Sequence, residues 1–295
     1  MKFFTALLSL LNHPNNKDKP FRTIGTLIWW KLNQIYFKLP AVYQLTSKIK
    51  ILCEPDSSYG SFIIYAGFPE YAEMKFIHDY LSKSDVMVDV GANIGAVSLL
   101  AADKITTGKV YCFEPTPKVF KKLQTNIVLN SLTNTIKSIN SAVSNKSGYL
   151  QFIIEEESEV NHISNLDSSQ INQSIQVKSV SLDEFILREK IKKINLLKVD
   201  VEGAEYSVFE GAKQSLKNHL IEIIVFEVNP KMKAFGTSLD QLLNLLNKYN
   251  YSMYKLKGKQ LIPFDASSFL NSTENLVAVS TQAKKRKKFK KLLIK

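Results

Sequence analysis

Cysteine and long apolar runs are both scarce in this sequence of 295 residues. Cys53 and Cys112 are its only cysteines, which excludes a disulfide framework or a cysteine-rich zinc site and fits a reducing compartment. No run reaches the roughly 18 uncharged apolar residues that a membrane-spanning helix needs. Residues 3–11 are largely apolar, but no small-residue cleavage site follows them, so we expect no secretory signal. These features predict a cytoplasmic protein.

Acidic residues are few at both ends of the chain. The net charge is +12, and residues 281–295 carry eight Lys or Arg and no Asp or Glu, while residues 1–60 carry eight against three. The central part is therefore close to neutral, which argues against a nucleic-acid-binding face across the domain. We expect a solvated basic tail, with residues 284–295 dispensable for folding and chemistry. A peripheral contact of the basic ends with anionic lipid is the alternative.

Three regions follow from the composition along the chain. We assign residues 1–85 to an accessory N-terminal arm, residues 86–280 to the main domain and residues 281–295 to the basic tail. Within the arm, residues 24–45 are rich in Trp, Tyr and Leu but are interrupted by lysines and a proline. We interpret this segment as an amphipathic, helical arm that favours a membrane surface.

Short apolar runs alternate with helical periodicity from residue 86 onward, which is typical of βαβ units. We predict an α/β fold with a Rossmann-like core, a mostly parallel sheet and a C-terminal antiparallel strand. The expected core strands lie at 86–90, 110–113, 136–143, 196–201, 221–228, 251–256 and 275–280. A helix is expected at 204–216. An inserted strand pair is expected at 149–154 and 175–182, with the polar stretch 156–174 as an exposed loop.

A glycine-containing turn follows the first predicted strand. The strand ends near Asp89 and continues through Gly91-Ala92-Asn93-Ile94-Gly95 into a helix. Glycine is needed where the backbone approaches a ligand closely, because a Cβ atom would block the approach. Glu114 closes the second strand about twenty residues later, where a carboxylate can accept hydrogen bonds from both hydroxyls of a ribose. The loop and Glu114 together predict a site for a cofactor that contains a ribose.

Two cofactor classes share this pattern. The oxidoreductase version has the form G-x-G-x-x-G, which presents backbone amides to a pyrophosphate. Here Asn93 stands in place of the second glycine, and no third glycine follows Gly95 at the required distance. Asp89 beside the loop favours the positively charged S-adenosylmethionine and would oppose a pyrophosphate. We therefore favour S-adenosylmethionine and keep an NAD-dependent oxidoreductase as the alternative.

Several motifs, in their order and spacing, resemble the FkbM-type methyltransferases. They are Val88-Asp89-Val90-Gly91-Ala92-Asn93-Ile94-Gly95, Phe113-Glu114-Pro115, Asn126, Ser141-Ala142-Val143, Leu182-Asp183, Lys198-Val199-Asp200-Val201-Glu202-Gly203-Ala204-Glu205 and Gly211-Ala212. The resemblance runs from about Glu70 to the strand that begins near Asn275. It implies a class I methyltransferase fold and S-adenosylmethionine as the methyl donor. It also implies, most often, O-methylation of a sugar or natural-product hydroxyl, with a small-molecule or glycan acceptor.

The resemblance also implies roles for individual residues at the cofactor site. The methionine portion would lie against the loop formed by Asp89, Gly91, Ala92, Asn93 and Gly95. Glu114 would hold the ribose. Ala142 and Val143 would lie near the adenine. Ser141 is a departure, because many class I enzymes have an acid there that faces the adenine amine.

A second charged group ends the strand expected at 196–201. On a strand, Lys198, Asp200 and Glu202 would point to one side, and three charges on a buried face must be paired or used. We predict that Asp200, with Glu202 beside it, takes the proton of the acceptor hydroxyl, while Lys198 keeps Asp200 ionised. The alternative is structural: Glu202 and Glu205 favour the dipole of the next helix, and Lys198 neutralises Asp200.

Metal-ligand spacing is missing, so we expect no metal. The acidic residues near Asp200, even with His162, match no dedicated set of ligands, and the histidines are expected to be ordinary surface or partly packed residues. A non-catalytic protein that uses residues 24–45 and 284–295 on a membrane surface or RNA is a further alternative. Against RNA, the basic ends lack the interleaved aromatic residues of a base-stacking platform.

Overall fold

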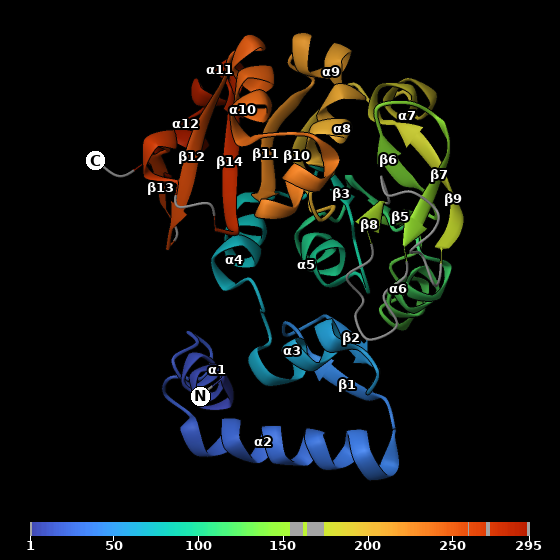
Figure 1. Ribbon diagram of the computed structural model, residues 1–295, viewed down its shortest axis with the longest axis vertical. Helices are drawn as coiled ribbons and strands as arrows, with labels where there is room; N and C mark the ends of the chain where they lie inside the picture. The colour runs from blue at the N-terminus through green and yellow to red at the C-terminus, as the bar shows by residue number, and fades with distance from the viewer. Residues whose placement is uncertain (1, 154–161, 164–173, 259, 270–271, 294–295) are drawn as a thin grey trace.

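The computed structural model describes residues 2–153, 162–163, 174–258, 260–269 and 272–293. The loop expected at 156–174 lies almost entirely outside these residues. An N-terminal segment sits below an α/β core (Figure 1).

The core is built around an eight-stranded sheet, counted over the described residues. In spatial order its strands are β13 (Gln260–Pro263), β12 (Tyr251–Lys257), β14 (Glu274–Ser280), β11 (Ile221–Val228), β10 (Ile194–Val199), β3 (Val86–Val90), β4 (Lys109–Phe113) and β5 (Ile136–Ile139). The neighbours from β5 to β11 pair in parallel, whereas β14 runs antiparallel to both β11 and β12. The predicted α/β class, with a mostly parallel sheet and a C-terminal antiparallel strand, is confirmed.

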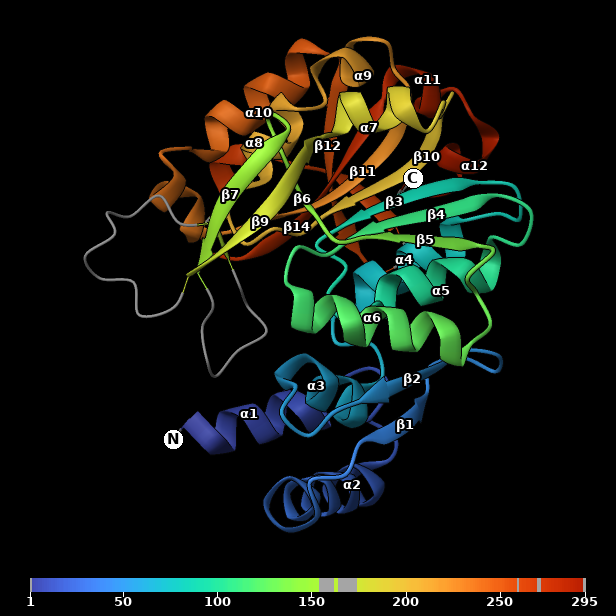
Figure 2. The same ribbon diagram turned by 90° about the vertical axis from the view of Figure 1, so that its right-hand side faces the viewer.

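Helices cover both faces of this sheet (Figure 2). One layer holds α4 (Tyr71–Tyr80), α5 (Ala96–Lys104) and α6 (Pro117–Leu129), and the other holds α7 (Leu182–Arg188), α8 (Glu205–Glu210), α9 (Lys213–Lys217) and α10 (Leu239–Lys248). Strand β11 is apolar on both sides for this reason. Ile223 and Val225 join the first hydrophobic core, and Ile224 and Phe226 join the second.

Two predicted elements are divided in the structure. The strand expected at 136–143 becomes β5 and β6 (Ala142–Ser144), and β6 leaves the main sheet. It joins a second sheet with the order β6-β9-β7-β8, in which β7 (Gly148–Ile153) and β9 (Ser174–Ser181) form the predicted strand pair and β8 is His162–Ile163. The pairing of β7 with β9 is antiparallel. The helix expected at 204–216 breaks into α8 and α9. At the break, a Cβ atom on Gly211 would lie 2.1 Å from the carbonyl oxygen of Ser144.

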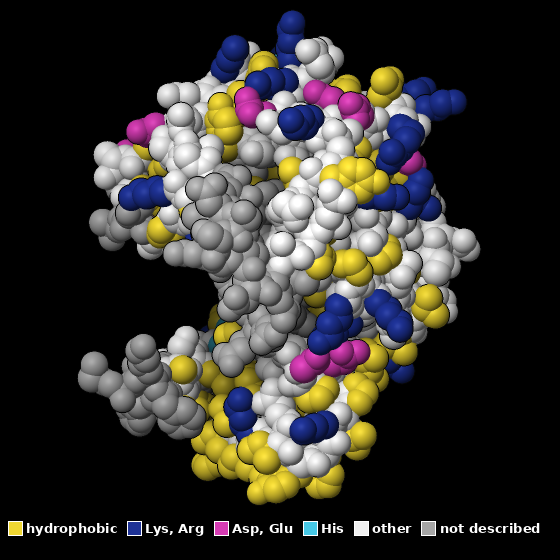
Figure 3. Space-filling model, turned by 45° about the vertical axis from the view of Figure 1, so that its right-hand side comes forward, with side chains coloured by type: hydrophobic (Ala, Val, Ile, Leu, Met, Phe, Trp, Pro, Cys, Tyr) yellow, Lys and Arg dark blue, Asp and Glu magenta, His cyan; other side chains and the backbone are white. Residues whose placement is uncertain are grey.

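The N-terminal segment is partly helical, as predicted. Its elements are α1 (Lys2–Leu11), α2 (Pro20–Leu32), the π-helix η1 (Asn33–Phe37), the antiparallel pair β1 (Ala41–Gln44) and β2 (Lys50–Cys53), and α3 (Ser58–Ala66). Helix α2 forms the end of the molecule farthest from the sheet, and hydrophobic side chains gather on that end (Figure 3).

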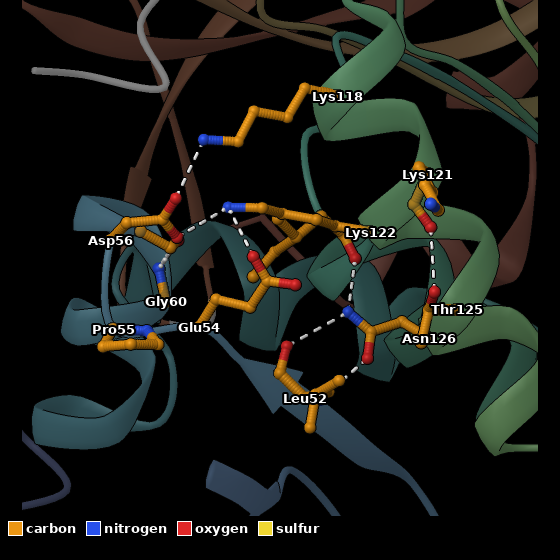
Figure 4. A network of polar contacts seen from close by, with 12 residues as sticks. Leu52, Glu54, Pro55, Asp56, Gly60, Lys118, Lys121, Lys122, Thr125 and Asn126 are labelled. Atoms are coloured by element: carbon orange, nitrogen blue, oxygen red, sulfur yellow. Dashed lines mark hydrogen bonds and ion pairs between the residues drawn. The ribbon is translucent and has the colours of Figure 1, made fainter. Parts of the chain in front are cut away.

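Helix α6 holds the N-terminal segment to the core (Figure 4). The side-chain amide of Asn126 accepts a hydrogen bond from Leu52 N at 2.7 Å and donates to the carbonyl oxygen of Ile94 at 3.0 Å. Lys122 pairs with Asp56 at 3.1 Å. Asn126 therefore connects β2 to the turn that precedes α5, and this turn belongs to the predicted cofactor loop.

The C-terminal residues form short helices that pack on the core. They are the 3-10 helix η3 (Ala266–Ser268), which precedes β14, and then α11 (Thr281–Lys284) and α12 (Lys287–Lys290). Phe289 is only 2% exposed and meets the Tyr254 ring edge-on at a centroid distance of 5.6 Å. Arg286 pairs with the buried Glu222 at 2.6 Å. The expectation of a solvated tail is therefore wrong, because α12 presents an aromatic side chain to the first hydrophobic core.

Among the described residues, no helix combines the length and apolar character that crossing a membrane requires.

Candidate functional site

A cavity opens where β3, β4 and β10 reach their carboxyl ends, which is the ligand-binding edge of a parallel α/β sheet. Its described lining includes most residues that the sequence analysis selected: Asp89, Gly91, Ala92, Asn93, Glu114, Ala142, Val143, Lys198, Asp200 and Glu202. Gly95 is the one selected residue outside this lining. The residues predicted to bind the cofactor, apart from Gly95, and the residues predicted to be catalytic therefore line a single cavity.

The glycine loop is shaped by close contact with the next strand connection. Gly91 has φ +86°, and a Cβ atom there would lie 1.8 Å from the carbonyl oxygen of Asp200. The amides of Gly91 and Ala92 both donate to the carbonyl oxygen of Phe113, at 3.1 and 2.9 Å. Gly95 has φ +96°, and its Cβ would lie 2.5 Å from Leu123 Cδ1. Gly91 therefore lets two chain segments meet at the cavity, whereas Gly95 lets α5 pack against α6.

Asp89 is fully buried beneath this loop. Its Oδ2 atom accepts a hydrogen bond from Ser98 Oγ at 2.6 Å. Its Oδ1 atom has no hydrogen-bond partner within the described part of the chain, although the residue lines the cavity. Burial raises the pKa of Asp89, while the positive charge of Lys198 acts in the opposite direction. A buried acceptor oxygen beside a cavity suits a ligand that brings a donor or a positive charge.

Glu114 marks the end of β4 and is only 7% exposed. The amide of Asn93 donates to Oε2 at 3.1 Å, and the amide of Thr116 donates to Oε1 at 2.8 Å. These bonds hold the carboxylate in one orientation at the cavity wall. A carboxylate offers about four acceptor positions, which suits a ligand with two neighbouring hydroxyls.

An apolar part of the cavity follows Glu114. It is lined by Phe113, Ala142, Val143 and Phe152, which come from β4, β6 and β7. Ser141 turns its hydroxyl away to donate to the carbonyl oxygen of Lys178 at 3.0 Å. Flat aromatic ligands suit such apolar walls, and the adenine position that the resemblance implied at Ala142 and Val143 stays a prediction.

Lys198 and Asp200 form an ion pair in the floor of the cavity. The Nζ atom of Lys198 lies 2.8 Å from Asp200 Oδ2 and 3.7 Å from Glu73 Oε1, and Lys198 is 4% exposed. Burial alone would lower the pKa of Lys198, but Asp200 and Glu73 outweigh it and raise that pKa well above its usual value. Lys198 therefore stays positively charged in the interior.

Glu202 departs from the expected arrangement. Strand β10 ends at Val199, and Glu202 has φ +56°, so the alternation of a strand does not apply to it. Its carboxylate pairs with Lys231 at 2.8 Å, on the 3-10 helix η2 (Pro230–Phe235). The expectation that Lys198, Asp200 and Glu202 share one face is therefore wrong, although all three residues line the cavity.

Glu205 holds the turn after β10. It is fully buried, and its Oε1 atom accepts hydrogen bonds from the amides of Val201 and Gly203 at 3.2 and 3.1 Å. Burial raises the pKa of Glu205 to about 8, against the effect of these amides. Glu205 thus stabilises the turn that carries Asp200 and Glu202, which agrees with the structural role that the sequence analysis kept open.

Three further titratable residues at or near the cavity were missed from the sequence: Tyr59, Glu70 and Glu73. Glu227 also lines the cavity. Burial raises the pKa of Glu73 to about 8 and that of Glu227 to about 7. Glu73 could have been found from the sequence, because it interrupts an otherwise largely apolar face of its helix. Tyr59 carried no such signal, since α3 reaches the cavity only through tertiary packing.

The described residues contain no cluster of three or more His, Cys, Asp or Glu side chains arranged to hold a metal ion. His78 Nε2 lies 3.1 Å from Asp103 Oδ2, away from the cavity. The side chain of His162 lies outside what the structure describes.

A mostly parallel sheet with an antiparallel strand near one edge, and a cavity at its carboxyl ends, defines the class I methyltransferase fold that the resemblance implied. The chain belongs to the family of the methyltransferase FkbM domain, whose model matches residues 89–253, more than half of the sequence.

Relatives of known name are methyltransferases. The chain is 29% identical over 162 residues to the hexuronic acid methyltransferase AglP of Haloferax volcanii, an alignment that covers 54% of this chain and 63% of that protein. It is 26% identical to Methyltransferase 1 of Beauveria bassiana, over 60% of this chain and 82% of that one. It is 24% identical to the 2-O-methyltransferase NoeI of Sinorhizobium fredii, over 46% of this chain and 61% of that protein. The match thus spans less than two thirds of the first and third relatives.

Solved structures resemble the chain more distantly. A methyltransferase from Agrobacterium tumefaciens, described as dependent on S-adenosylmethionine, aligns with a TM-score of 0.44 at 12% identity, over 82% of this chain and 70% of that one.

Proposed function

We propose that this protein transfers the methyl group of S-adenosylmethionine to a hydroxyl oxygen of a sugar, a glycan or a natural product. One observation carries the proposal: Asp89 and Glu114, which fit the methyl donor, line the same cavity as the Lys198–Asp200 pair. Donor and acceptor sites of a group-transfer enzyme must meet in this way. The family and the activities named for its relatives give the proposal independent support.

The residues present fit S-adenosylmethionine better than a dinucleotide. The buried Oδ1 atom of Asp89 suits a positively charged ligand, and Glu114 suits the two hydroxyls of a ribose. Among the described lining residues, Lys198 is the only Lys or Arg, and it already pairs with Asp200. A pyrophosphate would therefore meet carboxylates without a cation to balance it. This disfavours the NAD-dependent alternative.

Asp200 acts as the proton acceptor in the proposed reaction. When bound, S-adenosylmethionine supplies an electrophilic methyl group on a positively charged sulfur. On transfer of the methyl group to the acceptor oxygen, the Asp200 carboxylate would take the hydroxyl proton, a contribution of about 10²–10⁴-fold in rate. Lys198, at 2.8 Å, holds the carboxylate in position. The enclosure of the cavity aligns the acceptor oxygen with the methyl carbon.

The acceptor side of the cavity favours an uncharged or positively charged acceptor. Its walls carry Glu70, Asp200, Glu202 and Glu227, and the cations Lys198 and Lys231 are already paired with Asp200 and Glu202. A carboxylate on the acceptor would be repelled by these groups. We therefore propose a neutral or amino-bearing sugar or polyol as the acceptor, in contrast to the hexuronic acid named for the archaeal relative.

The test supplies S-adenosylmethionine labelled on its methyl group to cell extract fractionated into glycan, lipid and protein pools, with purified protein. The matched control is the Asp200→Asn variant, which keeps the shape of the side chain and removes its basicity. We expect label in a glycan or small-molecule pool with the unaltered protein and little label with the variant. Hydrolysis of the product should release label on a neutral or amino-bearing unit. Label on a uronic acid would contradict the acceptor proposal alone, and no transfer to any pool would contradict the activity.

A further inference from the structure

The outermost helix of the N-terminal segment exposes an unusual amount of apolar surface. Phe21, Ile28, Trp29, Ile35, Tyr36 and Phe37 are all more than half exposed. Phe21, Ile28, Ile35 and Tyr36 repeat at helical spacing along α2 and η1, so they form one outward stripe. Large aromatic side chains gathered in one exposed patch mark an interaction site rather than an ordinary surface.

The stripe cannot turn inward, because the opposite face of the same helices is already packed. Trp30 is fully buried, and its Nε1 atom donates to Ser61 Oγ on α3 at 2.9 Å. The side chain of Gln34 donates to the carbonyl oxygen of Pro55 at 2.8 Å, and that of Asn33 donates to the carbonyl oxygen of Leu39 at 2.7 Å. Helix α2 is therefore held against α3 through its packed face, and the apolar stripe faces outward.

The charges around the stripe are almost all positive. Residues 17–42 contain five Lys or Arg and one Asp. Arg22, Lys31 and Lys38 are exposed and lie on the same helices as the stripe. Blue side chains lie among the yellow ones at this end of the molecule (Figure 3). An apolar stripe bordered by cations complements the surface of a membrane that contains anionic lipid.

We propose that α2, η1 and the start of β1, residues 20–42, lie on the surface of an anionic membrane. A second copy of the chain is a poorer partner, because a two-fold contact would bring the same cations against one another. The helices are too short to span a bilayer, so the contact is peripheral, with the aromatic side chains at the level of the lipid headgroups. Helix α3 links this surface to the cavity, since it packs on Trp30 and carries Tyr59 and Phe62 into the cavity wall.

The test is co-sedimentation of the full chain with vesicles of phosphatidylcholine alone and of phosphatidylcholine mixed with phosphatidylserine. We expect binding to the mixed vesicles, weaker binding at high salt, and little binding to the neutral vesicles. The triple variant Phe21→Ser, Ile28→Ser, Tyr36→Ser should bind at least about tenfold more weakly. The variant Arg22→Gln, Lys31→Gln, Lys38→Gln should lose the preference for anionic vesicles.

The matched control is Val128→Ser with Leu187→Ser, which removes two exposed apolar side chains from elsewhere on the surface. It should bind vesicles as the unaltered protein does. Circular dichroism and S-adenosylhomocysteine binding of each variant report whether it is folded. Equal vesicle binding by a folded triple variant would overturn the proposal. So would self-association without vesicles that the triple variant abolishes, since the stripe would then be covered by a second copy.

Discussion

Lys198 is the residue on which the acidic cavity depends. It lies 2.8 Å from Asp200 and 3.7 Å from Glu73, so one buried cation serves two carboxylates. Removing one partner of a buried ion pair usually destabilises a protein by about 3–5 kcal/mol, because the other charge remains uncompensated. A substitution of Lys198 would therefore disturb folding and activity together, and Asp200 is the better position for a test of chemistry.

The Asp200→Asn variant should lose methyl transfer by about 10²–10⁴-fold while its affinity for S-adenosylhomocysteine changes little. The amide keeps the shape of the side chain, but it cannot take the acceptor proton. Rates measured with any accepted substrate, beside calorimetric binding of the product cofactor, separate the two effects. Full turnover in the variant would reject the role of Asp200 and move it to Glu202 or Glu227, which line the same cavity.

Glu205 makes stability depend on pH. Burial raises its pKa from 4.5 to about 8, so between these values the folded state holds a proton that the unfolded state has lost. The unfolded state then binds fewer protons, and the free energy of unfolding falls as pH rises through this window. The Glu205→Gln variant lacks this titrating group. Its free energy of unfolding should therefore fall less between about pH 4.5 and 8 than that of the unaltered protein.

Urea unfolding of Glu205→Gln at several pH values measures that dependence. The control is Glu210→Gln, on the same helix but partly exposed. A pH profile of the Glu205 variant that parallels that of the unaltered protein would show that this carboxyl does not hold a proton in the folded state.

Residues next to strand ends were predictable, and residues brought in by packing were not. Asp89 and Glu114 stand where strands finish, so the sequence alone placed them at one sheet edge. Tyr59, on α3, and Glu70, directly before α4, precede the first core strand and reach the cavity because these helices pack on the core. That docking depends on long-range contacts such as Asn126 with Leu52, which leave no local pattern.

Among the secondary-structure elements, boundaries were harder to predict than identities. The positions of the core strands along the chain were predictable, because each of β3, β10 and β11 is a short, largely apolar run that is buried in the sheet. The break between α8 and α9 was not, since it follows from the approach of Gly211 to the carbonyl oxygen of Ser144, 67 positions earlier in the chain. The end of β10 at Val199 likewise depends on the turn that Glu205 holds.

The packing of helix α12 on the core depends on the buried side chain of Phe289. Phe289→Ala should lower the free energy of unfolding by about 3–5 kcal/mol, because a buried aromatic side chain is removed and a cavity is left. Chemical denaturation measures the loss. The matched control is Lys291→Ala, which changes an exposed residue just after α12 and should alter stability by less than about 0.5 kcal/mol. Unchanged stability in Phe289→Ala would restore the solvated tail that the charge pattern suggested.

For the molecule as a whole, three parts meet at one cavity. The core supplies the glycine loop and Glu114, the strand connection after β10 supplies Asp200, and the N-terminal segment supplies the wall formed by Tyr59 and Phe62. The sequence predicted the first two parts, because they repeat a local strand-turn-helix pattern. It treated the third as an accessory arm, since amphipathic periodicity alone does not say where a helix docks.

The most direct test of the central claim is calorimetric binding of S-adenosylhomocysteine to the unaltered protein and to Glu114→Ala. The variant should bind at least tenfold more weakly, because each hydrogen bond to a charged group contributes about 1.5–3 kcal/mol. The control Asp240→Asn, an exposed carboxylate at the start of α10, should bind as the unaltered protein does, and NAD should not bind. Equal affinity of Glu114→Ala, or binding of NAD in place of S-adenosylhomocysteine, would contradict the account.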